Sequence, residues 1–172
     1  NDGSRYTPDV GADFRTAVGS KLTLNATVNP DFGQVEVDPA VVNLSDVETF
    51  FPEKRPFFVE GTNNYDFGYG GANNYMGFNW PGPSFFYSRR VGSAPTGGSY
   101  SAEYSDVPSG TSILGAGKLT GKIFGDWNLG LMQAVTAREF ADLSTASVKS
   151  RAEVEPLASY TVLRTQKEFQ KG

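Results

Sequence analysis

Hydrophobic and polar residues alternate with a period of two in several parts of the chain. The clearest alternation covers residues 21–29, where one face carries Leu22, Leu24, Ala26 and Val28 and the other carries Lys, Thr and Asn. A period of two is typical of a β-strand that has one buried face. The segment is therefore predicted to be a half-buried strand. Its apolar face is expected to meet lipid or protein, and its polar face to meet water.

Other segments with the same period predict hairpins and further strands. Residues 10–18 alternate in the same way, and Gly19-Ser20 joins them to residues 21–29. A short Gly-containing connection between two alternating runs predicts a β-hairpin. Gly125-Asp126 likewise joins residues 114–124 to residues 127–138, each long enough, at about 35 Å, to cross a tilted barrel wall. A short strand is predicted over residues 34–38. A last strand, whose two faces are mixed rather than alternating, is predicted over residues 157–169, after the Ser/Ala-rich residues 144–152.

The composition agrees with a mainly β fold. The chain has 172 residues with 20 Gly, 10 Pro and 13 Phe, and Gly and Pro both destabilise helix interiors. We predict one β-rich unit over residues 1–172, built of antiparallel hairpins in an outer-membrane-barrel-like or open sheet. Residues 61–84 are predicted to form a long ordered loop. At most one short helix is expected, over Asp46 to Phe50, because Ser45 and Glu48 have capping-box spacing.

Two phenylalanine doublets bracket a charged, proline-flanked segment at residues 52–56. Four rings so close together are expected to be buried, whereas Pro52 and Pro56 exclude one continuous helix or central strand. Two basic pairs, Lys54-Arg55 and Arg89-Arg90, lie beside aromatic residues, so one member of each is expected to need a carboxylate or backbone carbonyls. The candidate carboxylates are Glu48, Glu53 and Glu60. The predicted structural motif is Phe50, Phe51, Glu53, Lys54, Arg55, Phe57, Phe58, Arg89 and Arg90.

These motifs resemble a family of long bacterial proteins of unknown function. The resemblance rests on residues 30–36, 43–45, 50–58 and 86–92, with residues 113–139 and 154–169 also similar. Members of that family carry an N-terminal domain like the family-9 carbohydrate-binding modules, followed by a long strand-rich region like an outer-membrane β-barrel. The resemblance implies that this chain corresponds to the start of the barrel-like region, as a fragment of a longer protein. It implies no catalytic residues.

Composition and motifs argue against enzymatic and nucleic-acid-binding functions. The chain has no His and no Cys, so imidazole-based nucleophile pairs and thiolate or imidazole metal sites cannot form. Its net charge is −4, and no basic run exceeds a pair, which argues against a nucleic-acid partner. No cofactor is predicted. A paired-carboxylate glycosidase is formally possible, but ion pairing of the acidic residues is the favoured interpretation. For a calcium site at Asp31, Glu36 and Asp38, the favoured interpretation is an ordinary polar strand face.

Three functions remain open. The leading hypothesis is a non-enzymatic structural protein of the bacterial envelope, resembling part of an outer-membrane β-barrel. The rival is an extracytoplasmic accessory subunit docked on a larger membrane protein assembly, whose partners would cover unpaired strand edges. A weaker alternative is a carbohydrate-binding module, in which aromatic rings stack on sugars while neighbouring asparagines bind hydroxyl groups. The candidate contact residues are Tyr69, Tyr75 and Trp80.

Overall fold

The computed structural model describes residues 10–30, 50–65, 86–97, 102–146 and 148–169, and these form two antiparallel sheets with three short helical turns. The larger sheet has the order β1-β2-β4-β5-β8, and the smaller has the order β3-β6-β7. The helical turns are α1 (Pro56–Val59), η1 (Thr62–Asn64) and η2 (Ser88–Arg90). The strands are β1 (Ala12–Val18), β2 (Leu22–Val28), β3 (Tyr104–Asp106), β4 (Ile113–Ile123), β5 (Trp127–Thr136), β6 (Glu139–Thr145), β7 (Val148–Glu155) and β8 (Ala158–Lys167). The prediction of a mainly β, antiparallel fold is confirmed.

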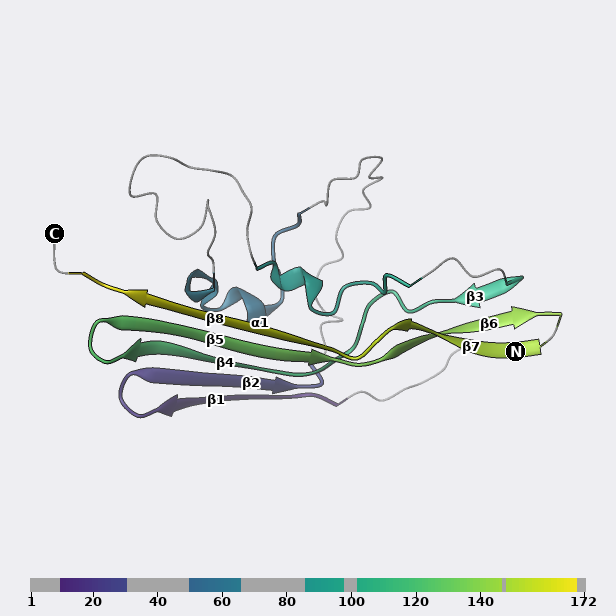
Figure 1. The fold of residues 1–172 in the computed structure, drawn as a ribbon. Helices are drawn as coiled ribbons and strands as arrows, with labels where there is room; N and C mark the ends of the chain where they lie inside the picture. The colour runs from purple at the N-terminus through teal and green to yellow at the C-terminus, as the bar shows by residue number, and fades with distance from the viewer. Residues whose placement is uncertain (1–9, 31–49, 66–85, 98–101, 147, 170–172) are drawn as a thin grey trace.

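Both predicted hairpins are present, and their turns depend on left-handed backbone. Gly19 has φ of 65° in the β1–β2 turn, and Gly125 has φ of 81° in the β4–β5 turn. Glycine adopts this conformation without a steric penalty from Cβ. The two turns lie at the same end of the sheet, because Leu22 pairs with Gly121 (Figure 1).

Two sequence predictions about elements differ from the structure. The short helix is α1, which begins at Pro56 because proline fits the first helical position. Phe50 lies in no helix, and the rest of the predicted Asp46 to Phe50 helix falls outside the described residues. The Ser/Ala-rich residues 144–152, for which no strand was predicted, lie largely in the β6–β7 hairpin. The predicted strand over residues 34–38 also falls outside the described residues.

Strands β6 and β7 continue β5 and β8 beyond the larger sheet. β5 pairs with β8, and β6 pairs with β7, so that one hairpin lies within the other. In Figure 1 the smaller sheet projects from the end of the larger sheet that lies opposite the two tight turns. Among the described residues the larger sheet does not close, because its edge strands β1 and β8 each have one paired neighbour.

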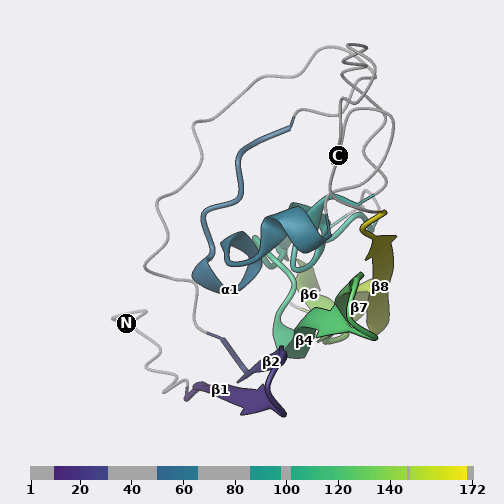
Figure 2. The same ribbon diagram turned by 90° about the vertical axis from the view of Figure 1, so that its left-hand side faces the viewer.

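The two faces of the larger sheet have different surroundings. Residues 50–65 and 86–97, here called the cap, lie on one side of it (Figures 1 and 2). The face beneath the cap is called the covered face, and the opposite face is called the open face. A transverse row of leucines crosses the open face, because the register pairs each one with the next. The row consists of Leu24, Leu119, Leu131 and Leu163.

The covered face carries the polar residues of β2, which corrects one prediction. Asn25 is 8% exposed and Thr27 is 2% exposed, so the polar face of this strand does not meet water as predicted. The apolar face is the open one, where Val28 is 60% exposed and Leu163 is 63% exposed. The hydrophobic core lies between the covered face and the cap. It contains Phe58, Tyr65, Val91, Ile113, Ala116, Met132, Ala134 and Val162.

Candidate functional site: the cap and its attachment to the sheet

The centre of the cap is an ion pair between Arg55 and Glu53. Their side chains are only 12% and 11% exposed, and Arg55 Nη2 lies 2.7 Å from Glu53 Oε2. Arg55 Nε also donates to Glu53 Oε1 at 2.8 Å, which makes the pair bidentate. Such paired geometry is what the planar guanidinium group favours. The guanidinium carbon also lies 4.3 Å from the centroid of the Phe58 ring.

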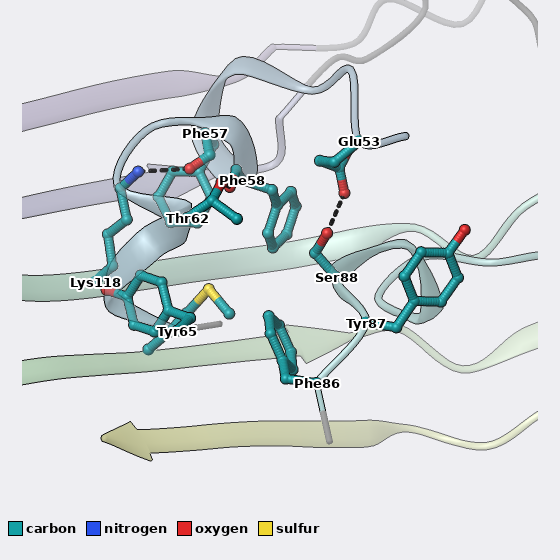
Figure 3. Close-up of a pocket in the computed structure, with 10 residues that line it drawn as sticks. Glu53, Phe57, Phe58, Thr62, Tyr65, Phe86, Tyr87, Ser88 and Lys118 are labelled. Atoms are coloured by element: carbon teal, nitrogen blue, oxygen red, sulfur yellow. Dashed lines mark hydrogen bonds between the residues drawn. The ribbon is translucent and has the colours of Figure 1, made fainter. Parts of the chain in front are cut away.

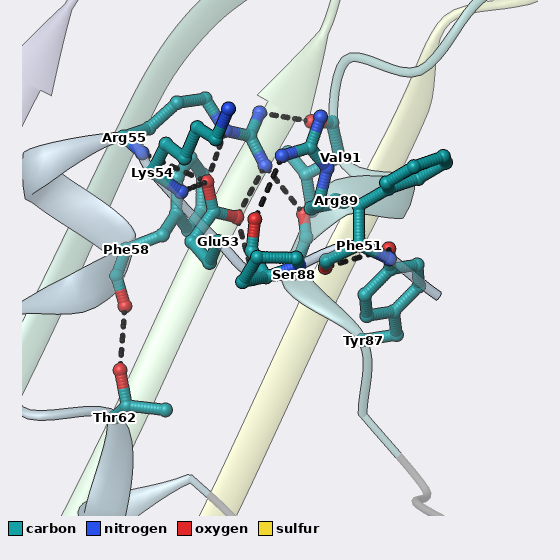
Figure 4. A network of polar contacts seen from close by, with 11 residues as sticks. Phe51, Glu53, Lys54, Arg55, Phe58, Thr62, Tyr87, Ser88, Arg89 and Val91 are labelled. Carbon is teal, nitrogen blue, oxygen red and sulfur yellow. Dashed lines mark hydrogen bonds and ion pairs between the residues drawn. The ribbon is translucent and has the colours of Figure 1, made fainter. Parts of the chain in front are cut away.

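The same pair joins the two halves of the cap, which lie far apart in the sequence. Arg55 donates to the carbonyl oxygens of Ser88 at 2.8 Å and of Val91 at 2.6 Å. The Ser88 hydroxyl donates to Glu53 Oε2 at 2.6 Å. Figure 4 shows these bonds converging between residues 51–58 and 87–91. The two family-like motifs therefore form one hydrogen-bonded unit.

Hydrogen bonding determines the charge state of Glu53. Burial by itself raises the pKa of this carboxyl, but the hydrogen bonds from Arg55 and Ser88 outweigh burial and hold the pKa below its ordinary value. Glu53 is therefore ionised at neutral pH, as its contacts with Arg55 require.

A second set of contacts joins the two halves at Tyr87. The Tyr87 hydroxyl accepts a hydrogen bond from the Phe51 amide at 2.8 Å and donates to the Phe51 carbonyl at 3.0 Å. Phe50 packs edge-on against the Tyr87 ring with centroids 4.9 Å apart. Arg89 donates to the Pro52 carbonyl at 2.9 Å. The side chain of Tyr87 thus fixes the first residues of the cap against its second half.

Lys118 of β4 fastens the cap to the sheet. Its side chain is 2% exposed, and its Nζ donates to the carbonyl oxygens of Phe57 and Glu60 at 2.6 Å each. These carbonyls belong to the last turn of α1 and the residue after it, where helix carbonyls have no partner within the helix. Burial lowers the pKa of Lys118, and the nearby Glu60 carboxylate partly opposes that change. Figure 3 shows Lys118 reaching from the sheet to Phe57.

Three other polar contacts attach the cap to the sheet. The Tyr65 hydroxyl donates to the Leu131 carbonyl at 3.2 Å, and burial raises the pKa of that hydroxyl. Arg164 of β8 donates to the Asn63 carbonyl at 2.9 Å, and Arg15 of β1 lies 2.5 Å from Glu60. Contacts from β1, β4, β5 and β8 thus hold one side of the cap.

A cavity of about 170 Å³ lies where the cap meets the sheet. Aromatic rings of the cap form most of its wall, and Lys118 and Met132 form the sheet side (Figure 3). Within the described residues no group of three or more acidic side chains could hold a metal ion. The cavity therefore lies within the packing between two layers, the cap and the sheet.

The structure brings most of the predicted motif residues together. Glu53 is the carboxylate partner of Arg55, and Arg89 binds a backbone carbonyl, as the sequence suggested. Phe58 is 5% exposed, whereas Phe50 is 59% exposed, so the expectation that all four rings are buried is wrong for Phe50. Arg90 is exposed, and Lys54 donates its amide to Glu53 Oε1 at 3.1 Å.

Several predicted residues fall outside the described part of the chain. They are Tyr69, Tyr75 and Trp80 of the sugar-binding alternative, Asp31, Glu36 and Asp38 of the calcium alternative, and Glu48. Lys118 is the attachment residue that sequence reasoning did not single out. A lone lysine among Gly, Ala and Leu in an alternating strand was the available signal, but alternation does not reveal which face a cap will cover.

The fold and the site together define a β-sheet protein in which a cap of two distant segments packs on one face of an open sheet. Within the described residues, no helix is long and apolar enough to span a membrane. The chain belongs to the family described as a domain of unknown function, DUF5916, whose model matches residues 1–172. Comparisons with curated proteins and with solved structures gave no match.

Proposed function

We propose that this chain is a structural, non-catalytic part of the wall of an outer-membrane β-barrel in the bacterial envelope. Its open face contacts lipid, and its covered face and cap lie on the inner side of the barrel. The role is proposed for a longer protein that begins with a domain like the family-9 carbohydrate-binding modules.

The distribution of charge between the two faces carries the proposal. In the described strands of the larger sheet, the register places five charged residues on the covered face and one, Lys167 at the end of β8, on the open face. An inner polar face and an outer apolar face are the arrangement of membrane barrels, whereas a soluble sheet buries its apolar face. The covered charged residues are Asp13, Arg15, Lys118, Lys122 and Arg164.

Strand lengths and edges support the same conclusion. β4 has 11 residues, and β5 and β8 have 10 each, which matches the roughly 9–11 residues of a tilted membrane-spanning strand. The unpaired edges β1 and β8 need further strands, because open sheet edges do not occur in hydrocarbon. Those strands would come from the longer protein.

The alternative is an accessory subunit whose open face docks on another envelope protein. The same observation favours it, because protein can cover an apolar face as well as lipid can. Charged substitutions on that face would be harmful in either case. The two functions differ in what touches the open face.

A lipid-confined quencher distinguishes the two functions. The chain contains no Cys, so Leu24→Cys and Leu131→Cys each provide one labelling position for a polarity-sensitive fluorophore in reconstituted bilayers. We expect quenching at both positions and none at Ser150→Cys, a control on exposed β7. A folded protein without quenching at 24 and 131 would contradict the barrel-wall proposal and favour the docked subunit.

A further inference from the structure

Lys167 is the only charged residue that the described strands of the larger sheet place on the open face. It pairs in register with Trp127, whose face continues through Leu129 and Leu131. The next residue, Glu168, does not neutralise it, since the Glu168 carboxylate receives hydrogen bonds from Lys122 and Asn128. The positive charge of Lys167, at the end of an apolar face, is therefore available to a different partner.

Two aromatic rings lie beside this lysine. Its Nζ lies 5.7 Å from the centroid of the Trp127 ring and 5.0 Å from that of Phe169. Phe169 is 80% exposed. Aromatic rings and lysines that extend from apolar surface toward water are typical of the membrane interface. We call Lys167, Trp127 and Phe169 the aromatic rim.

The position of the rim along the strands fits the edge of a hydrocarbon layer. Trp127 lies four residues from Leu131 in the leucine row, which corresponds to about 13 Å along a strand and about 10 Å after a tilt of roughly 40°. The apolar band of an outer-membrane barrel is about 25 Å tall, so its edge lies about 12 Å from its middle. With the leucine row at mid-depth, the ammonium group of Lys167 reaches the level of the headgroup phosphates.

We propose that Lys167, held beside Trp127 and Phe169, binds the phosphate of an anionic phospholipid headgroup at the end of the sheet that carries the two tight turns. The inference rests on the proposed function. An ammonium group binds phosphate as a compact charge, and the rings keep it at the interface. The site selects an anionic lipid because a zwitterionic headgroup supplies its own cation.

Lipid quenching of Trp127 tests the site directly. Trp80→Phe leaves Trp127 as the only tryptophan, because the chain has two. The full chain is reconstituted in two bilayers. One contains brominated phosphatidylglycerol diluted in unlabelled phosphatidylcholine, and the other contains brominated phosphatidylcholine at the same mole fraction in unlabelled phosphatidylglycerol. We expect roughly five-fold enrichment of the anionic lipid near Trp127, the effect of about one lysine near an anionic surface.

Two variants distinguish a specific site from general attraction. Lys167→Gln should abolish the enrichment, and Lys122→Gln should retain it, because Lys122 lies at the same end on the covered face and pairs with Glu168. Equal loss in both variants, or no loss with Lys167→Gln, would overturn the inference. Displacement of the enrichment by millimolar inorganic phosphate at constant ionic strength would assign the site to a free anion and also overturn it.

The fluorophore at position 131 separates this inference from the function on which it rests. If lipid quenches that fluorophore while Trp127 shows no enrichment of anionic lipid, the proposed lipid site is wrong and the barrel-wall proposal is retained. If neither position is quenched in a folded protein, the barrel wall itself fails.

Discussion

At the scale of single residues, the cap depends on a few nearly buried charges whose partners are all within the chain. Arg55 contacts a carboxylate, two carbonyls and one aromatic ring. A buried ion pair stabilises a fold only when hydrogen bonds satisfy both partners, and removal of one partner leaves an uncompensated charge. Arg55 and Glu53 are therefore the residues whose loss the cap should tolerate least.

We expect Arg55→Met to destabilise the protein by about 3 kcal/mol, because it leaves the Glu53 carboxylate buried without its main partner. Chemical denaturation measures this change in the free energy of unfolding. Arg151→Met is the matched control, since Arg151 pairs with Asp142 at 3.1 Å while both side chains are more than half exposed. The control should cost less than about 1 kcal/mol. Equal losses would show that the buried pair has no special role.

The lowered pKa of Glu53 predicts acid sensitivity with a definite sign. Because the folded-state pKa lies below the unfolded one, the stabilisation from Glu53 is complete above about pH 4.3, the ordinary value for glutamate, and is lost as the pH falls through the folded pKa. Denaturation of the wild type and of Glu53→Gln between pH 3 and 7 checks this. The difference in stability should be constant near neutrality and shrink in acid. Glu168 also has a lowered pKa, but it is present in both proteins, so its contribution cancels in the difference in stability. A difference independent of pH would contradict the assignment.

At the scale of elements, the sequence predicted where the strands lie better than it predicted what covers each face of the sheet. Alternation placed β1, β2, β4 and β5, because a strand with unlike faces leaves a period of two in the sequence. β8 was predicted although the two faces of residues 157–169 are mixed. Alternation did not predict which face the cap covers, because that depends on residues far away in the chain, such as Phe58 above Met132. The β6–β7 hairpin was missed because Ser, Lys, Ala and Glu on exposed strands leave no apolar period. The partners of Arg55 were partly predictable, since Glu53 is adjacent, whereas Lys118 and Tyr65 act through contacts that only the fold creates.

The fit between cap and sheet depends on a glycine of β5. A Cβ on Gly130 would lie 2.5 Å from the Asn64 carbonyl oxygen, whereas a Cβ on Gly117 of β4 would have Asn25 O at 3.9 Å as its nearest neighbour. We expect Gly130→Ala to destabilise by about 1–3 kcal/mol through displacement of the cap. Gly117→Ala on the open face should be neutral within about 0.5 kcal/mol. Thermal unfolding compares the two, and equal tolerance would mean that the cap does not press on this strand.

At the scale of the whole molecule, the chain combines nearby and distant pairings. β1–β2, β4–β5 and the nested hairpin of β5 to β8 join neighbouring segments, whereas β2–β4 joins segments separated by the cap. One sheet contains strands from both ends of the described chain, and the single β-rich unit over residues 1–172 stays a prediction.

The nested hairpin has a consequence for the order in which the protein folds. Pairing that begins at the tip between β6 and β7 can extend residue by residue into β5 and β8, so each step closes only a short additional loop. The β2–β4 pairing closes a long loop and should form later. We therefore expect Val154→Ala, at a residue 3% exposed in β7, to slow folding, and Leu24→Ala in β2 mainly to speed unfolding. Folding and unfolding rates of both variants in denaturant provide the measurement. If Leu24→Ala slowed folding and Val154→Ala mainly sped unfolding, strand pairing would not begin at the β6–β7 tip. A chain built in this way would bring its charged tip together before its apolar open face is assembled, which shortens the time that this face spends incomplete in water.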